Sequence, residues 1–310
     1  MMKRDFISIT DAGNRLSSLI TSAVKLKAEL RRGTGHVKQK PLSGMNVGLI
    51  FEKSSTRTRV SFEVGINQLG GNALYLSSKD LQMGRGETVA DTARVLSRYV
   101  DCLVYRAYEN RLMRELAGHS TVPVVNALDD TEHPCQILAD LMTIREKFGK
   151  LKGLKLAYVG DGNNVCHSLM LGAAMSGVNF VAATPSAYAP SEKIGQMAAS
   201  ISLENRCSIE VITDPQIAVR KANVVYTDVW VSMGQEAEKD EKEKVFMPFQ
   251  VNSRLMALAD SHAIVMHCLP AHRGMEITDD VLDGRQSVVF DQAENRLHAQ
   301  KALLVWLMKR

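Results

Sequence analysis

The sequence has little that points to an export signal, a membrane or a nucleic acid. Its 310 residues include five cysteines, an odd number without a CxxC pair or a zinc-ligand spacing, which we interpret as reduced intracellular thiols. Nowhere do about eighteen apolar residues run together, and the amino terminus lacks the apolar stretch of a signal peptide. We therefore expect a cytoplasmic protein without a membrane partner.

An excess of charge of one sign is also missing. The 38 basic and 34 acidic residues give a formal net charge of +4, and neither a basic tail nor a basic stripe is present. Nucleic acid is therefore not an expected partner. The carboxylates form no ligand cluster in the sequence, so we expect no metal. A small anionic substrate could account for a few clustered arginines.

Short β-branched runs alternate with longer helical patterns, which is typical of parallel sheets with crossover helices. The 45% of hydrophobic residues is ample for sizeable cores, and 310 residues suggest two domains. We predict an α/β fold of two domains, each a parallel sheet flanked by helices, joined by interdomain helices. The expected bounds are 1–149 for the first domain, 150–290 for the second and 291–310 for a C-terminal helix.

The same pattern gives positions for the individual elements. The first domain is expected to hold strands near 45–51, 72–77, 101–106 and 122–126, and helices near 57–69, 88–99, 110–118 and 134–148. The second is expected to hold strands near 155–160, 179–184, 208–213, 223–228, 263–268 and 287–291. The final stretch places four leucines on one face of a helix, which predicts that it packs back on the first domain.

Residues 55–59 read Ser-Thr-Arg-Thr-Arg, where an apolar run stops and a helical pattern begins. A helix start carries unpaired backbone N–H groups and the positive end of the macrodipole, so hydroxyls and arginines there can converge on an anion. Arginine adds a bidentate geometry that suits a compact dianion such as a phosphate group. The alternative is an ordinary Ser/Thr N-cap followed by surface arginines.

Residues 160–165 read Gly-Asp-Gly-Asn-Asn-Val after a strand, which invites a dinucleotide-binding interpretation. We reject it, because Val165 replaces the third glycine of that fingerprint and the next strand ends without an acidic residue for the ribose. The turn is better interpreted as a loop that presents side chains, such as Asn164, at the carboxyl edge of the sheet. No cofactor is therefore expected.

Two further clusters carry polar groups. In His133-Pro134-Cys135-Gln136, the histidine stands at a helix start and the glutamine three residues on shares its face, although a simple capping histidine is the alternative. The run 267–270, His-Cys-Leu-Pro, ends a buried strand. A cysteine after an apolar run usually belongs to the core. Its position at the carboxyl end of a strand favours a site instead.

These segments resemble the aspartate/ornithine carbamoyltransferase family over nearly the whole chain, and its ornithine-specific members most closely. The residues 55–59 resemble the carbamoyl phosphate loop, and Arg106 at the end of a strand resembles a further polar contact. Residues 228–234, Asp-Val-Trp-Val-Ser-Met-Gly, resemble the mobile loop of the ornithine enzymes. The run 267–270 resembles their ornithine-binding cysteine motif, and Arg296 follows in a matching Glu-Asn-Arg stretch.

The resemblance implies transfer of the carbamoyl group of carbamoyl phosphate to the side-chain amine of L-ornithine, which gives citrulline and phosphate. It implies a place in arginine metabolism, where we expect biosynthesis, with breakdown as the other direction. It also implies a homotrimer with active sites at the subunit interfaces, where Gln82 reaches into the neighbouring subunit's site.

The resemblance further assigns roles to residues of this sequence. The implied catalytic residues are Thr58, Arg106, His133, Asp228 and Cys268. The implied carbamoyl phosphate contacts are Ser55, Thr56, Arg57, Thr58, Gln82, Arg106, His133, Gln136 and Arg296. The implied ornithine contacts are Asn164, Asp228, Ser232, Met233, Cys268 and Leu269. Which group accepts the amine proton stays open.

Three alternatives are kept beside this interpretation. A carbamoyltransferase acting on putrescine or aspartate should lack the combination of Ser-Met-Gly at 232–234 with His-Cys-Leu-Pro at 267–270. A non-catalytic protein that binds a phosphorylated metabolite would keep the phosphate loop and lose the carbonyl donors. A nicotinamide oxidoreductase is opposed by the missing glycine and acidic residue.

Overall fold

The computed structural model describes residues 3–30, 40–78, 80–231 and 239–309. The chain divides into two compact units. Unit 1 is Met1–Met142 with Glu294–Arg310, and unit 2 is Thr143–Ala293. The boundaries fall within two helices, α5 (Pro134–Phe148) and α12 (Val289–Met308). The domain bounds expected from the sequence lie near these boundaries without coinciding with them, and they stay a prediction.

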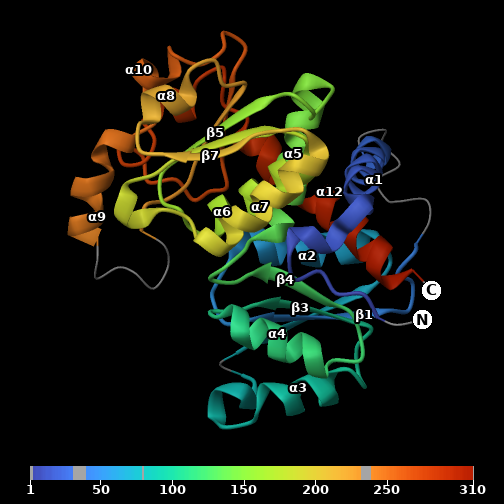
Figure 1. Ribbon diagram of the computed structural model, residues 1–310. Coiled ribbons are helices and arrows are strands. Elements are labelled where there is room, and N and C mark those ends of the chain that lie inside the picture. Colours follow the sequence, from blue (N-terminus) through green and yellow to red (C-terminus); the bar gives the residue numbers. More distant parts are fainter. Residues whose placement is uncertain (1–2, 31–39, 79, 232–238, 310) are drawn as a thin grey trace. The chain divides into compact units, whose positions relative to one another are not determined.

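Unit 1 is built on a four-stranded parallel sheet in the order β2-β1-β3-β4. Its strands are β1 (Asn46–Phe51), β2 (Asn72–Ser77), β3 (Cys102–Arg106) and β4 (Val124–Leu128). Its further helices are η1 (Ile9–Arg15), α1 (Leu16–Glu29), α2 (Thr56–Gln68), η3 (Gln82–Arg85), α3 (Val89–Leu96) and α4 (Asn110–His119). Helix α2 covers one face of the sheet, and α3 and α4 cover the other (Figure 1).

The strands of unit 1 are buried according to their place in the sheet. The central strand β3 is buried at every position, as expected for a parallel strand covered on both faces. Toward α3 and α4, Leu103 and Tyr105 pack with Met113 and Leu116. The edge strand β2 is partly exposed along its whole length. Because β1, β3 and β4 are neighbouring parallel strands, their carboxyl ends lie together at one edge of the sheet.

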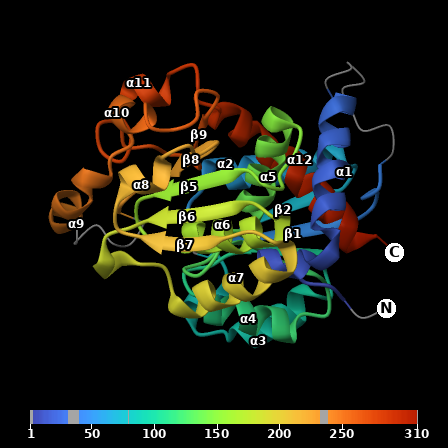
Figure 2. The same ribbon diagram turned by 45° about the horizontal axis from the view of Figure 1, so that its top comes forward.

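Unit 2 is built on a five-stranded parallel sheet in the order β7-β6-β5-β8-β9, and the arrows of β5, β6 and β7 run the same way in Figure 2. Its strands are β5 (Lys155–Val159), β6 (Asn179–Ala183), β7 (Ile209–Ile212), β8 (Val224–Thr227) and β9 (Ile264–His267). Its further helices are α6 (Asn164–Ser176), η4 (Ser186–Tyr188), α7 (Glu192–Asn205), α8 (Pro215–Val219), α9 (Lys239–Phe246), η6 (Met247–Phe249), α10 (Ser253–Met256) and α11 (Asp279–Leu282).

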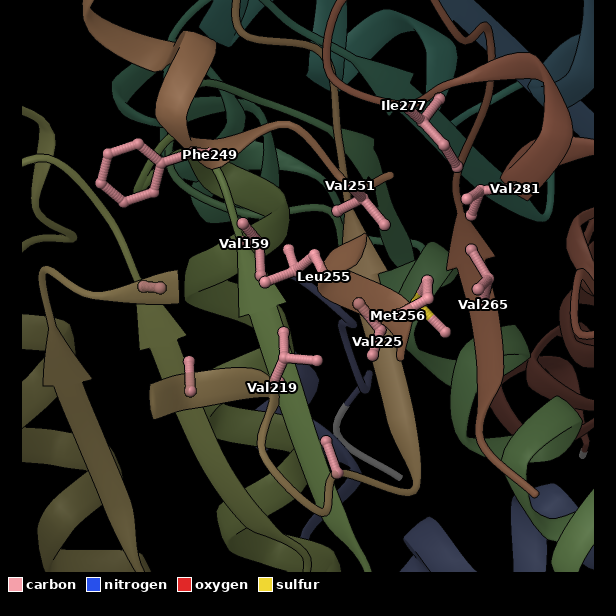
Figure 3. Packing of buried hydrophobic residues seen from close by; sticks show 14 of the residues in the cluster. Val159, Val219, Val225, Phe249, Val251, Leu255, Met256, Val265, Ile277 and Val281 are labelled. Atoms are coloured by element: carbon pink, nitrogen blue, oxygen red, sulfur yellow. The ribbon is translucent and has the colours of Figure 1, made fainter. Parts of the chain in front are cut away.

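A hydrophobic core of unit 2 lies on the sheet face that carries α8 and α10. Alternate strand residues, among them Val159, Val225 and Val265, point to this face and meet Leu255 and Met256 of α10 (Figure 3). The intervening strand residues point to the other face, toward α6 and α7. Both faces are thus buried, which explains why the strands read as nearly continuous apolar runs.

The expected fold class is confirmed, since both units are parallel sheets flanked by helices. Nine expected strands lie within two residues of their predicted positions. Among the described residues, none of the helices combines the length and apolar character needed to cross a bilayer.

The strand predicted at 287–291 is wrong. Ser287 forms a single bridge with Val265, and the chain then enters α12 at Val289. The backbone N–H of His267, on this side of β9, donates to the side-chain Oε1 of Gln292 at 3.0 Å. A helical side chain therefore takes the place that a sixth strand would have filled. Two adjacent β-branched valines gave a local strand pattern that the following helical turn overrides.

Candidate active site

The hydroxyl-rich turn at the start of α2 is held by its own side chains. Ser55 is the N-cap of α2, and its Oγ accepts a hydrogen bond from the Thr58 N–H at 3.3 Å. This is the ordinary capping role that the sequence left open as an alternative. Thr58 is buried, Arg57 is half-buried and Thr56 is exposed. The motif therefore places polar side chains around a helix N-terminus, whose dipole favours negative charge.

Arg106 brings a charged group to the carboxyl edge of the unit 1 sheet. It ends β3, and it is only 7% exposed. The register with β4 shifts here, because Tyr105 pairs with Asn126 whereas Arg106 pairs with Leu128. Such irregularities re-aim side chains next to functional sites. Open α/β folds bind their ligands at this edge.

Arg296 of α12 connects two of the predicted motifs. Its Nη1 donates to Gln136 Oε1 at 2.5 Å, and its Nη2 donates to Thr58 Oγ1 at 3.1 Å. All three residues are buried. The Gln136 amide is in turn oriented by Asp140, whose Oδ1 accepts from Gln136 Nε2 at 2.8 Å. The starts of α2 and α5 and the middle of α12 thus contribute to one hydrogen-bonded cluster.

His133, which directly precedes α5, is buried close to these cations. Burial lowers the pKa of its imidazole well below the usual range, and the positive charges of Arg296, Arg106 and Arg57 lower it further. The ring is therefore neutral near pH 7. A neutral imidazole can donate a hydrogen bond from one nitrogen without adding to the local positive charge.

Unit 1 therefore gathers three guanidinium groups around one uncharged ring. The same charge also reaches Lys53, whose pKa is lowered by burial and then by Arg106. Concentrated positive charge that is shielded from water favours an anion with several oxygen acceptors. The structure brings together most of the residues predicted to bind carbamoyl phosphate. Gln82 lies exposed at the start of η3.

Unit 2 carries a carboxylate, a thiol and an amide in direct contact. The Cys268 thiol, after β9, donates to Asp228 Oδ1 at 3.0 Å, and Asp228 follows β8. The other carboxylate oxygen, Oδ2, accepts from Asn163 Nδ2 at 2.9 Å. Neighbouring parallel strands end at the same edge of the sheet, which explains why these two polar segments meet. Both residues belong to the predicted ornithine site.

His267 holds the backbone next to Cys268 in place. Its Nδ1 accepts a hydrogen bond from the Leu269 N–H at 2.8 Å, so the ring proton is on Nε2, which faces Glu276 Oε1 at 3.2 Å. His267 and Glu276 are fully buried. Leu269 itself adopts a left-handed backbone with φ of +59°, which is rare for a side chain of this size. The histidine thus fixes the turn that follows Cys268.

Asp228, His267 and Cys268 also offer ligand atoms within 4.8 Å of one another, as a metal site would. Both ring nitrogens of His267 are occupied by hydrogen bonds, and the thiol donates to the carboxylate. A metal would have to break these bonds. We therefore assign the three residues to a hydrogen-bonded network.

The remaining residues predicted to bind ornithine are placed as follows. Asn164 is the first residue of α6, and Leu269 is half-buried beside Cys268. Ser232 and Met233 lie outside the described residues.

Several residues of the site were missed from the sequence. Asn163 contacts Asp228, and its Oδ1 also caps α6 by accepting from the N–H groups of Val165 and Cys166. An asparagine just before a helix is a capping signal that could have been used. The sequence gave no such signal for Asp140. Its role comes from its contact with Gln136, a motif residue on the same face of α5.

The neutral state of His133 predicts a pH-dependent stability. Because its pKa is depressed in the folded state, the unfolded chain binds the proton more readily below about pH 6.5, and stability falls as the pH decreases. His133 should contribute a slope of up to about 1.4 kcal/mol per pH unit to the free energy of unfolding between pH 6 and 5. Urea denaturation of wild type and His133→Gln measures it.

His262, whose side chain is 89% exposed, provides the matched control. His262→Gln makes the same substitution at an exposed position, outside the cluster of cations. Equal slopes for wild type and His133→Gln would show that His133 takes up its proton as easily in the folded chain, contrary to its placement among cations.

Two family models match this chain. The carbamoyl-P binding domain of aspartate/ornithine carbamoyltransferase matches residues 4–146, and the Asp/Orn binding domain of the same family matches residues 152–307.

Curated relatives and solved structures extend over the same length. The ornithine carbamoyltransferase of Methanoculleus marisnigri is 54% identical over 308 residues, which cover 99% of this chain and 97% of that protein. The catabolic ornithine carbamoyltransferase of Thermoplasma acidophilum is 50% identical, with 99% of each chain covered. The solved structure of the ornithine carbamoyltransferase from Pyrococcus furiosus superposes with a TM-score of 0.95 at 52% identity, covering 99% of this chain and 97% of its own. The chain belongs to the aspartate/ornithine carbamoyltransferase family.

Proposed function

We propose that this chain is an ornithine carbamoyltransferase, which forms citrulline and phosphate from carbamoyl phosphate and L-ornithine. The observation that carries the proposal is that an anion site in unit 1 accompanies a carboxylate–thiol pair in unit 2. Relatives of this name match nearly the full chain. The reaction belongs to arginine metabolism, and we assign it to biosynthesis, with breakdown as the alternative suggested by the relative named catabolic.

Carbamoyl phosphate is assigned to the cluster of unit 1. Its phosphate group binds at the start of α2, to Ser55, Thr56, Arg57 and Thr58, with Arg106. Its carbonyl oxygen accepts hydrogen bonds from Thr58, Arg106 and His133, and the loss of one such donor costs about 3–4 kcal/mol of transition-state stabilisation. Gln136 contacts the carbamoyl amide, and Arg296 completes the pocket.

Gln136 is suited to this contact because its orientation is fixed. The carbamoyl nitrogen carries only donors, so it requires an acceptor, and the amide oxygen of Gln136 has a second lone pair beside the one used by Arg296. Asp140 holds the amide nitrogen on the other side. Rotation of the amide would instead present a donor to Arg296 and to the substrate.

Ornithine is assigned to the network of unit 2. Asp228 attracts the side-chain ammonium, and Cys268 and Leu269 orient the amine for attack on the carbonyl carbon. As the new C–N bond forms, the bond to phosphate breaks and the amine loses a proton. Asn164 and Asp228, with Ser232 and Met233, hold the α-amino and carboxylate groups.

We further propose that copies of the chain assemble as a homotrimer in which Gln82 of one subunit completes the next subunit's site. The exposed position of Gln82 in η3 supports this role. The edge strand β2 and the outer face of α2 also expose apolar side chains that another copy could cover: Val60, Val64, Leu74 and Tyr75. We place the enzyme in the cytoplasm, because all five cysteines are free thiols.

The test is citrulline formation from carbamoyl phosphate and ornithine, beside parallel assays with putrescine and with aspartate. Strong turnover with ornithine alone is expected. Turnover with another amine would keep the assignment of unit 1 and overturn that of unit 2. An absence of turnover with every amine, in a protein that still binds carbamoyl phosphate, would favour a binding protein.

The pH dependence of this reaction should follow the amine of the substrate. An amine with a pKa of about 10.4 is less than about a thousandth unprotonated at pH 7. We expect kcat/KM for ornithine to rise by about tenfold per pH unit between pH 6 and 8. The lowered pKa of His133 moves its protonation toward more acidic pH, away from this rise. A flat profile with chemistry rate-limiting would contradict this account.

Removal of the Asp140 side chain should lower kcat/KM for carbamoyl phosphate and leave the KM for ornithine nearly unchanged. In Asp140→Ala the Gln136 amide loses the acceptor for its nitrogen, and a buried donor without a partner costs about 1–3 kcal/mol. We expect kcat/KM for carbamoyl phosphate to fall about tenfold to a hundredfold, with the KM for ornithine changed less than about twofold. Asp140→Asn, which keeps an acceptor oxygen, is the control. Equal losses for both substrates in steady-state kinetics would refute the specific role of this contact.

A further inference from the structure

Helix α9 packs on the rest of unit 2 with a side that includes a buried charged residue. Its sequence, Lys-Asp-Glu-Lys-Glu-Lys-Val-Phe, is almost entirely charged. Of its described side chains, only Lys242 and Phe246 are buried. These residues are four positions apart and therefore lie on the same side of the helix. A lysine occupies the place where an amphipathic helix would ordinarily bury an apolar residue.

Lys242 forms a buried ion pair. Its side chain is 2% exposed, and its Nζ donates to Asp161 Oδ2 at 2.9 Å. The same Nζ lies 5.2 Å from the centroid of the Tyr188 ring, which in turn packs on Phe246. Burying two charges is costly, and an apolar pair of similar volume is often as stable. An ion pair, however, specifies which groups must meet. An apolar contact specifies this only loosely.

Asp161 belongs to the tight turn after β5. Its carbonyl accepts from the Tyr158 hydroxyl and from the Asn163 N–H, both at 2.7 Å. Gly162 lies against the chain at 188–190, where an added Cβ would come within 2.3 Å of the Pro190 nitrogen. The turn is thus fixed on its backbone side, and Lys242 fixes it on its side-chain side.

The next residue of the turn reaches the ornithine network. Asn163 Nδ2 donates to Asp228 Oδ2, and Asp228 Oδ1 accepts from the Cys268 thiol. Asn163 also caps α6, so a displacement of the turn would move both this cap and the contact with Asp228. Continuous contacts therefore lead from Lys242 through the turn to the carboxylate that is assigned to the substrate amine.

We propose that Lys242 and Asp161 are positioning residues for ornithine, because their ion pair holds the turn at 160–163 in the place where Asn163 orients Asp228. The proposal rests on the proposed function. Neither residue is among those assigned to ornithine, and neither belongs to the carbamoyl phosphate cluster of unit 1. Loss of the pair should therefore weaken the use of one substrate only.

The test compares steady-state constants for both substrates in Lys242→Met, which keeps the length of the side chain and removes its charge. We expect the KM for ornithine to rise at least about tenfold, corresponding to about 1.4 kcal/mol, and the KM for carbamoyl phosphate to change less than about twofold. Lys242→Arg, which can still pair with Asp161, should recover most of the ornithine affinity. Lys244→Met, on an exposed position of the same helix, should match the wild type.

A second variant separates positioning from stability. Lys242→Met leaves Asp161 buried without its cation, so the double variant Asp161→Asn, Lys242→Met removes both charges. We expect the double variant to recover thermal stability and to keep the raised KM for ornithine. It also decides the question where the single variant does not fold.

A KM for ornithine within twofold of the wild type, in either folded variant, would overturn the proposal and leave the ion pair a structural role alone. A wild-type protein that forms no citrulline would instead overturn the proposed function. The two failures are thus distinguishable in one set of assays.

Discussion

The positive charge that Arg57, Arg106 and Arg296 concentrate around His133 is the constraint on which the site of unit 1 depends. These guanidinium groups surround a buried imidazole, and their charge together with burial keeps that imidazole neutral. Like charges in a poorly solvated site destabilise the folded chain unless polar groups or an anion offset them. Thr58 and Gln136 supply polar groups locally, since both accept hydrogen bonds from Arg296, and a bound anion would offset the positive charge further. These hydrogen bonds organise the site before an anion arrives.

Unit 2 solves the opposite problem, since its proposed substrate brings the positive charge. Its site is therefore built from a carboxylate that accepts hydrogen bonds from a thiol and from an amide. Other buried groups hold the backbone on either side of this network in place. His267 fixes the turn after Cys268, and the ion pair of Lys242 fixes the turn before α6. Each unit thus keeps its reactive groups on sheet ends and its rigidity in buried contacts.

The sequence predicted what depends on local pattern and left out what depends on distant contacts. Arg106 and Cys268 could be placed because each ends a buried strand of a parallel sheet. The predicted strand at 287–291 failed because the side chain of Gln292, which no local pattern announces, pairs with β9. Lys242 was missed because a charged residue in a charged helix is normally exposed. Its burial is set by Asp161, 81 residues away in the chain.

The most direct test of the charge constraint is the free energy of unfolding with and without inorganic phosphate at constant ionic strength, in the wild type and in Arg57→Met. Phosphate at about a hundred times its dissociation constant should stabilise the wild type by about 2.7 kcal/mol. The variant should gain much less, while its stability without phosphate should equal or exceed that of the wild type. Equal stabilisation of both proteins, or a variant that is weakened without phosphate, would contradict a cluster of cations held for a dianion.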